Sequence, residues 1–191
     1  MYGATTGESG RLVPRLRRTY PRAMALVDEA ARTGEDGGLV STWLGRTSPP
    51  PSEGWSQAQS RATEIEASGA EETRARRQAR DRGRFTRNFI VQGTAAEWAL
   101  AWMAELRTRL AALPPVAVPD AAERSGPVFA RQPHLAFFLH DEVIVHTPAA
   151  YADEAAVAVR EAAASTARLL FGDFPMDFPL DVRIAESALK D

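Results

Sequence analysis

The sequence predicts an α+β fold in which helices pack against an antiparallel strand pair. Three stretches, 12–32, 85–113 and 149–170, have the apolar pattern or the composition of helices. The stretch LAFFLHDEVIVHTP at 135–148 instead holds two short apolar runs on either side of a polar trio. That arrangement is typical of two strands joined by a tight turn. A last strand is expected in the closing stretch FGDFPMDFPLDVRIAES.

The first third of the chain predicts short elements. Apolar residues at helical spacing in 12–32 are interrupted by Pro14 and Pro21 and stop at GEDGG, so we expect two short helices. Residues 38–46, GLVSTWLGR, have the pattern of a strand that leads into a Gly-Arg turn. Residues 48–60 are rich in Pro, Ser and Gly and predict a loop.

The middle of the chain predicts two helices of different character. Residues 61–83 are rich in Ala, Glu and Arg, which favours an exposed helix. Residues 85–113 are apolar over much of a helical surface and predict a buried helix, which Pro114 and Pro115 end. The segment VAVPDAAERSGP predicts a further loop before the strand pair.

Composition limits the kinds of protein this can be. The 191 residues with 45% apolar content suit one sizeable core. No run approaches the roughly 20 apolar residues of a membrane span, and MYGATTGESG lacks the layout of a signal peptide, so we expect a cytoplasmic protein without a membrane partner. Cysteine is absent, so any metal ligand must be an oxygen or an imidazole. Residues 1–90 carry a net charge of +4 and residues 91–191 a net charge of −6.

The trio His140, Asp141 and Glu142 is the first candidate site. Burying a charge is costly unless a partner compensates it. Because the flanking residues are continuously apolar, we interpret 135–147 as a buried hairpin whose tip presents the trio. Carboxylates at such a tip suit a hard cation such as Mg²⁺. The alternative is a polar turn between two core strands, which pattern alone favours.

A run of arginines is the second candidate site. Seven Arg and a single acidic residue, Asp81, lie between positions 74 and 87. Four of these arginines recur at steps of three and four residues and share a helix face: Arg77, Arg80, Arg84 and Arg87. A cationic stripe is typical of proteins that bind phosphate backbones. The alternative is a solvated helix face whose charge is offset by the acidic residues at 64, 66, 71 and 72.

Arg84, Asn88 and Gln92 form a third set at i, i+4 and i+8 of the same helix. All three side chains donate hydrogen bonds, and the minor groove presents acceptors at nearly the same places for every base pair. Such a row could detect correct pairing without reading sequence. Alternatively these are solvated side chains, with Gln92-Gly93-Thr94 a helix kink.

Taken together, these motifs resemble the C-terminal part of the family A DNA polymerases, the DNA polymerase I type. HDEVIV at 140–145 is similar to that family's third polymerase motif, and RFTRNFIVQGTAAEW at 84–98 to the preceding palm motif. Tyr2-Gly3 is similar to the end of the fingers helix, and TWLGR at 42–46 to the strand and turn that follow. The resemblance spans nearly the whole chain and is faint at 48–75. The wording of the second motif is closest to bacterial polymerases that follow a 3'-5' exonuclease domain.

The resemblance implies an architecture and a role for each motif residue. Residues 1–40 would end the fingers subdomain, 41–83 would form a strand, a polar loop and the Arg-rich helix, and 84–191 would form the C-terminal palm. The reaction would be template-directed addition of a dNTP to a primer 3'-hydroxyl with two Mg²⁺ ions. The implied roles are metal binding for Asp141 with Glu142 auxiliary, primer-terminus contact for His140, minor-groove contact for Arg84 and Gln92 supported by Asn88, and template stacking for Tyr2.

The family pattern also includes parts that this sequence lacks. A second metal-binding aspartate and the fingers Arg and Lys that hold the triphosphate are missing. We therefore expect a fragment of a longer polymerase that works with the missing N-terminal part, binds primer-template DNA and dNTP, and is inactive alone. The alternatives are a non-catalytic nucleic-acid-binding module that uses the Arg stripe, a structural or partner-binding protein, and a different metal-dependent phosphoryl-transfer enzyme.

Overall fold

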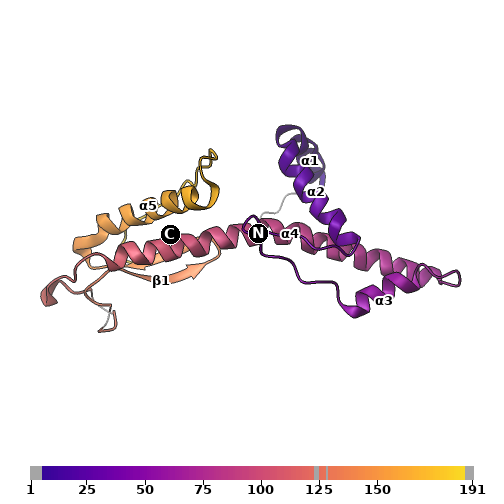
Figure 1. The fold of residues 1–191 in the computed structure, drawn as a ribbon. Coiled ribbons are helices and arrows are strands. Elements are labelled where there is room, and N and C mark those ends of the chain that lie inside the picture. The colour runs from indigo at the N-terminus through magenta and orange to yellow at the C-terminus, as the bar shows by residue number, and fades with distance from the viewer. Residues whose placement is uncertain (1–5, 123–124, 128, 188–191) are drawn as a thin grey trace. The chain divides into compact units, whose positions relative to one another are not determined.

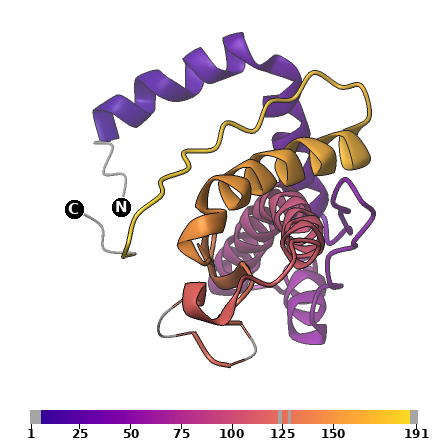
Figure 2. The same ribbon diagram turned by 90° about the vertical axis from the view of Figure 1, so that its left-hand side faces the viewer.

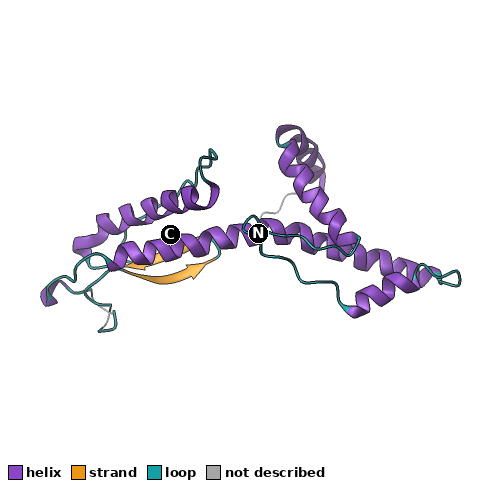
Figure 3. Ribbon diagram, in the orientation of Figure 1, coloured by secondary structure: helices purple, strands orange, loops and turns teal. Residues whose placement is uncertain are grey.

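The structure is a computed structural model that describes residues 6–122, 125–127 and 129–187, with side chains described from residue 12 on. The chain divides into two compact units, residues 1–95 and 96–191, and each is described by itself. The described elements, drawn in Figures 1 and 3, are α1 (Thr6–Thr19), α2 (Pro21–Glu35), α3 (Glu53–Arg61), α4 (Gly69–Ala111), η1 (Val118–Asp120), β1 (His134–Leu139), β2 (Glu142–His146), η2 (Ala149–Tyr151) and α5 (Ala152–Phe171). The mixed helix and strand content agrees with the predicted α+β class.

The first unit is held together by a very close contact between α2 and α4. Thr86 of α4 is fully buried and donates a 2.7 Å hydrogen bond to the carbonyl oxygen of Ala30 in α2. The close approach needs glycine on both helices. A methyl group at Gly34 would come within 2.0 Å of the Thr86 hydroxyl oxygen, and one at Gly83 within 2.9 Å of the Ala31 carbonyl oxygen. The structure also confirms the two short helices predicted before residue 36. They are α1 and α2, and Pro21 is the first residue of α2.

The second unit has its core between the C-terminal half of α4, α5 and one face of the hairpin. Large buried side chains of α4, among them Trp102, Leu106 and Leu110, pack against the Ala-rich face of α5. Trp102 donates its indole N–H to the carbonyl oxygen of Val159 at 3.1 Å. Small residues on α5 let the two helices run side by side, as Figures 1 and 2 both show. Three hairpin residues, Leu135, Val143 and Val145, complete this core from the sheet side.

The hairpin is a two-stranded antiparallel sheet with a bulge in β1. Its register pairs His134 with His146, Leu135 with Val145, Phe137 with Ile144, Phe138 with Val143, and Leu139 with Glu142. Because paired residues share a face, Phe137 and Ile144 lie on the face away from the core. They are 50% and 38% exposed, and Leu139 is 50% exposed. The prediction of a buried hairpin is therefore wrong, since only one face is covered in the described part of the chain.

Four other predicted elements differ from the structure. The expected strand at 38–46 is a single antiparallel bridge between Ser41 and Thr47. The expected loop at 48–60 contains α3. The helices expected at 61–83 and 85–113 are one helix of 43 residues, α4. The closing segment after α5 pairs with no strand over its described residues, so the predicted last strand is absent there.

No helix in the described ranges is both long enough and apolar enough to cross a membrane.

Candidate nucleic-acid interface and carboxylate turn

The predicted carboxylates lie in the turn of the β1–β2 hairpin. His140 and Asp141 form the two-residue turn, and Glu142 begins β2 opposite Leu139. His140 has a φ of 56°, in the left-handed region that a tight hairpin turn requires at its first central residue. All three side chains are exposed. The turn therefore places the charged side chains in solvent. Val143 and Val145 pack against the core and hold the part of the hairpin next to the turn in place.

Two side chains of the carboxylate turn have the chemistry of magnesium ligands. Asp141 and Glu142 offer oxygen ligands, the type that Mg²⁺ prefers, and this cation commonly binds through one or two carboxylates plus waters and substrate phosphates. Among the described residues, no group of three or more His, Cys, Asp or Glu side chains is placed to hold a metal ion. The donor type fits Mg²⁺, whereas the donor number suits one side of a two-ion centre at most.

The cationic row Arg77, Arg80, Arg84 and Arg87 lies on α4 in the first unit, and all four side chains are exposed. Asp81 offsets part of its charge, because its carboxylate pairs with Arg84 and lies 4.0 Å from Arg77. Arg80 and Arg87 form no ion pair with any residue that the structure describes. These two guanidinium groups are the strongest candidates for contact with an external anion.

One arginine of the run has an internal role that the sequence pattern did not reveal. Arg82 is partly buried and donates hydrogen bonds to the carbonyl oxygens of Gly38 and Pro49, at 3.2 and 3.1 Å. It therefore ties the segment between α2 and α3 to α4. Partial burial lowers the pKa of Arg82, although the group remains cationic. Its position, two residues from Arg80 and Arg84, places it on a different face of the helix.

The donor row Arg84, Asn88 and Gln92 is also exposed on α4. The residues that follow the row are packed. A methyl group at Gly93 would come within 2.6 Å of the Thr42 side chain, and Thr94 accepts a 3.1 Å hydrogen bond from the Trp43 backbone N–H. The helix α4 continues through residues 92–94. Gly93 and Thr94 therefore pack against the turn that the Ser41–Thr47 bridge closes.

The predicted site residues are divided between the units. The cationic row and the donor row belong to residues 1–95, and the carboxylate turn belongs to residues 96–191. Tyr2, the predicted template-stacking residue, lies outside the described residues.

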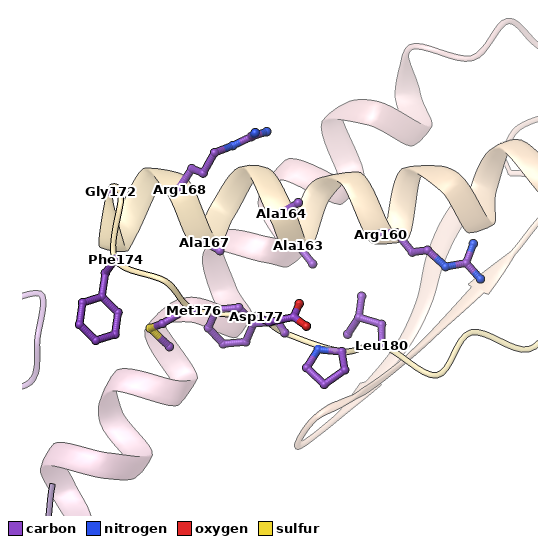
Figure 4. A pocket seen from close by; sticks show the side chains of 12 residues that line it. Arg160, Ala163, Ala164, Ala167, Arg168, Gly172, Phe174, Met176, Asp177 and Leu180 are labelled. Carbon is purple, nitrogen blue, oxygen red and sulfur yellow. The ribbon is translucent and has the colours of Figure 1, made fainter. Parts of the chain in front are cut away.

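The second unit also contains a cavity of about 450 Å³ between α5 and the segment that follows it (Figure 4). Most of its lining residues are apolar, including Ala163, Ala167 and Met176, and the charged ones are Arg160, Arg168 and Asp177. Phe178 anchors the segment by stacking on Trp98, with ring centres 4.3 Å apart. None of the sequence-predicted site residues lines this cavity.

Comparison with known proteins gives no relative for this chain: no protein-family model, no curated protein and no solved structure matches it.

Proposed function

We propose that this chain is the C-terminal part of a DNA-directed DNA polymerase of the family A type. The observation that carries the proposal is the exposed turn with Asp141 and Glu142 on a hairpin whose base is held by the core. The exposed donor row at 84, 88 and 92 supports it, as do two cationic side chains, Arg80 and Arg87, without a carboxylate partner in the described residues.

Each group has a defined task in this proposal. Nucleotidyl transfer joins the primer 3'-oxygen to the α-phosphorus of a dNTP while the bond to pyrophosphate breaks. Two Mg²⁺ ions would stabilise the attacking and leaving oxygens. Asp141 and Glu142 would hold one side of this centre, and His140 would lie against the primer terminus. The rigid base of the hairpin suits this task, because the reaction depends on positioning and on charge neutralisation.

In this proposal the helix α4 contacts the DNA. The cationic row would neutralise backbone phosphates, with Arg80 and Arg87 contributing most because neither needs to leave an ion pair. Arg84, Asn88 and Gln92 would donate hydrogen bonds to minor-groove acceptors, which are nearly independent of sequence. A polymerase needs this kind of recognition, since it must accept every correct pair.

The proposal requires a further polypeptide segment. Two carboxylates make half of a two-ion centre, and the outer face of the hairpin exposes Phe137, Leu139 and Ile144. Both edges of the two-stranded sheet are also without a paired strand in the described chain. Additional palm strands, carrying the second aspartate, would cover such an edge and such a face. We accordingly expect no polymerase activity from these 191 residues alone.

A non-catalytic nucleic-acid-binding module is the second candidate, and the unpaired Arg80 and Arg87 favour it. Both candidates predict duplex binding, but only the polymerase depends on Asp141. The deciding experiment is primer extension in Mg²⁺ by the longer polypeptide that carries this chain at its C-terminus. We expect Asp141→Ala to reduce extension at least about a hundredfold while leaving DNA affinity unchanged. Equal extension by both proteins would contradict the metal role, and DNA binding without any extension would favour the binding module.

A further inference from the structure

Two of the three histidines in the chain meet at the open end of the hairpin, away from the carboxylate turn. His134 in β1 and His146 in β2 are cross-strand partners, and their ring centres lie 5.5 Å apart at an interplanar angle of 84°. Paired residues project from the same face of a sheet. His146 is four residues from Glu142, or about 13 Å along an extended strand. The histidine pair is therefore a separate location from the carboxylate turn.

The hydrogen bonds of both rings leave the same nitrogen available. The His134 Nδ1 lies 3.2 Å from the Gln132 carbonyl oxygen, which can only accept, so the proton of the neutral ring is on Nδ1. The His146 Nδ1 lies 2.5 Å from the Ser125 hydroxyl oxygen, which can donate to it or accept from it, and the site uses the tautomer in which the hydroxyl accepts. In that tautomer both Nε2 atoms carry free lone pairs. A ring N–H donated to a carbonyl or hydroxyl is the usual support of a metal-binding histidine.

The separation of the rings also suits a shared ion. Zinc–imidazole bonds are about 2.0–2.1 Å long, so two imidazoles on one tetrahedral ion have their centres about 5 to 6 Å apart. The observed 5.5 Å lies in this range. Phe129 stacks on His134 with ring centres 4.7 Å apart and restricts the rotation of that ring. Both histidines are half-buried, which reduces the side-chain freedom that binding would remove.

We propose that His134 and His146 form a binding site for a divalent transition-metal ion of the Zn²⁺ class. Imidazole ligands select Zn²⁺, Cu²⁺ or Ni²⁺ over Mg²⁺, which prefers oxygen. No third His, Cys, Asp or Glu of the described chain joins the pair, so water or a small anion fills the remaining positions. The ion would tie β1 to β2 at the base of the hairpin and, through Ser125, would fix the preceding loop.

The test is a titration of the untagged full chain with Zn²⁺ by calorimetry in a non-chelating buffer. We expect one ion per chain with a dissociation constant in the micromolar range. His134→Gln and His146→Gln should each weaken binding by about tenfold or more. His140→Gln removes the third histidine of the chain and is the matched control, because it lies in the turn and should leave affinity unchanged.

A measurement on the unmodified chain avoids dependence on variants that unfold. Long-range ¹H–¹⁵N spectra of the histidine rings should show that Zn²⁺ shifts the Nε2 signals of two histidines and leaves their Nδ1 atoms protonated. Absence of Zn²⁺ binding below about 1 mM would overturn the proposal, as would an equal loss of affinity in His140→Gln.

Discussion

The Thr86 hydroxyl of α4 lies between three backbone carbonyl oxygens, and the nearest of them, at 2.7 Å, belongs to Ala30 of α2. Thr86 is fully buried, so this contact joins the two helices at a point that water does not reach. Gly34 faces the same hydroxyl, since a methyl group there would come within 2.0 Å of it. The position of α2 in the first unit thus depends on one small residue in each helix.

We expect Gly34→Ala to lower the free energy of unfolding by about 1–3 kcal/mol, because the added methyl group overpacks the contact with Thr86. Gly54→Ala is the matched control, because nothing lies within 4 Å of the added methyl group at this position of α3. Urea denaturation followed by circular dichroism measures both. An unchanged midpoint for Gly34→Ala would show that α2 is not packed as described.

Thr86→Val tests the hydrogen bond separately from the packing, because valine keeps the shape of threonine. The Ala30 carbonyl oxygen would lose its side-chain donor, and we expect a loss of about 1–3 kcal/mol in the free energy of unfolding. Thr108→Val is the control, since Thr108 is exposed on the same helix α4 and its hydroxyl bonds only within that helix. Equal losses in both variants would argue against a special role for Thr86.

Phe178 and Phe174 lie four residues apart in the segment after α5 but differ in their surroundings. Phe178 stacks on Trp98, whereas Phe174 is 68% exposed. We expect Phe178→Ala to destabilise the second unit by about 1–3 kcal/mol and to change tryptophan fluorescence, with Phe174→Ala close to wild type. A similar response in the two variants would mean that the stack does not hold the segment.

The N-terminus of α4 carries a pH-dependent contact. The Ser68 hydroxyl and backbone N–H both donate to the Glu71 carboxylate, at 2.7 and 2.9 Å, and these bonds lower the pKa of Glu71. A carboxylate whose pKa is lower in the folded state stabilises that state above its unfolded pKa. The contribution is lost as pH falls through the folded pKa.

Ser68→Ala should therefore accelerate amide exchange in the first turn of α4 at neutral pH. The difference from wild type should diminish once Glu71 is protonated in acid. Ser60→Ala is the control, because Ser60 is exposed near the end of α3 and its hydroxyl makes no bond to a carboxylate in the described residues. A difference between wild type and Ser68→Ala that grows on acidification would contradict the assigned direction.

Duplex binding tests the cationic row. Replacing both Arg80 and Arg87 with Gln should weaken primer-template binding by about tenfold at low salt and reduce the slope of log K against log salt by about 2. The same substitutions at Arg76, which pairs with Glu72 at 2.8 Å, and at Arg107, which is exposed further along α4, form the control. Equal effects in the two double variants would indicate nonspecific attraction rather than a defined row.

Several features of the molecule followed from the sequence because their causes are local. Pro21 begins α2, the helix that precedes Pro114 ends at Ala111, and the hairpin turns at His140 and Asp141. The spacing of the arginines placed Arg77, Arg80, Arg84 and Arg87 on one face of the helix, since a helix repeats every 3.6 residues whatever surrounds it. These outcomes depend on backbone geometry and on nearest neighbours in the chain.

The strand predictions that were wrong concern elements that need a distant partner, whereas the loop expected at 48–60 contains the helix α3. Residues 38–46 have strand character, yet their Trp43 N–H bonds to Thr94 and only one bridge forms. The helices expected at 61–83 and 85–113 form one continuous helix, α4, in which Gly83 packs closely on Ala31. A strand forms only where another strand meets its hydrogen bonds, and the sequence does not say which segments meet.

The sequence by itself determined where the hairpin turns, where α2 begins, and which side chains carry charge along α4. Tertiary structure alone decided that Arg82 serves the fold while Arg80 and Arg87 face solvent, and that His134 and His146 stand together across the hairpin. The physical reason is that these relationships join residues far apart in the chain. They depend on strand register and helix packing, which no local pattern encodes.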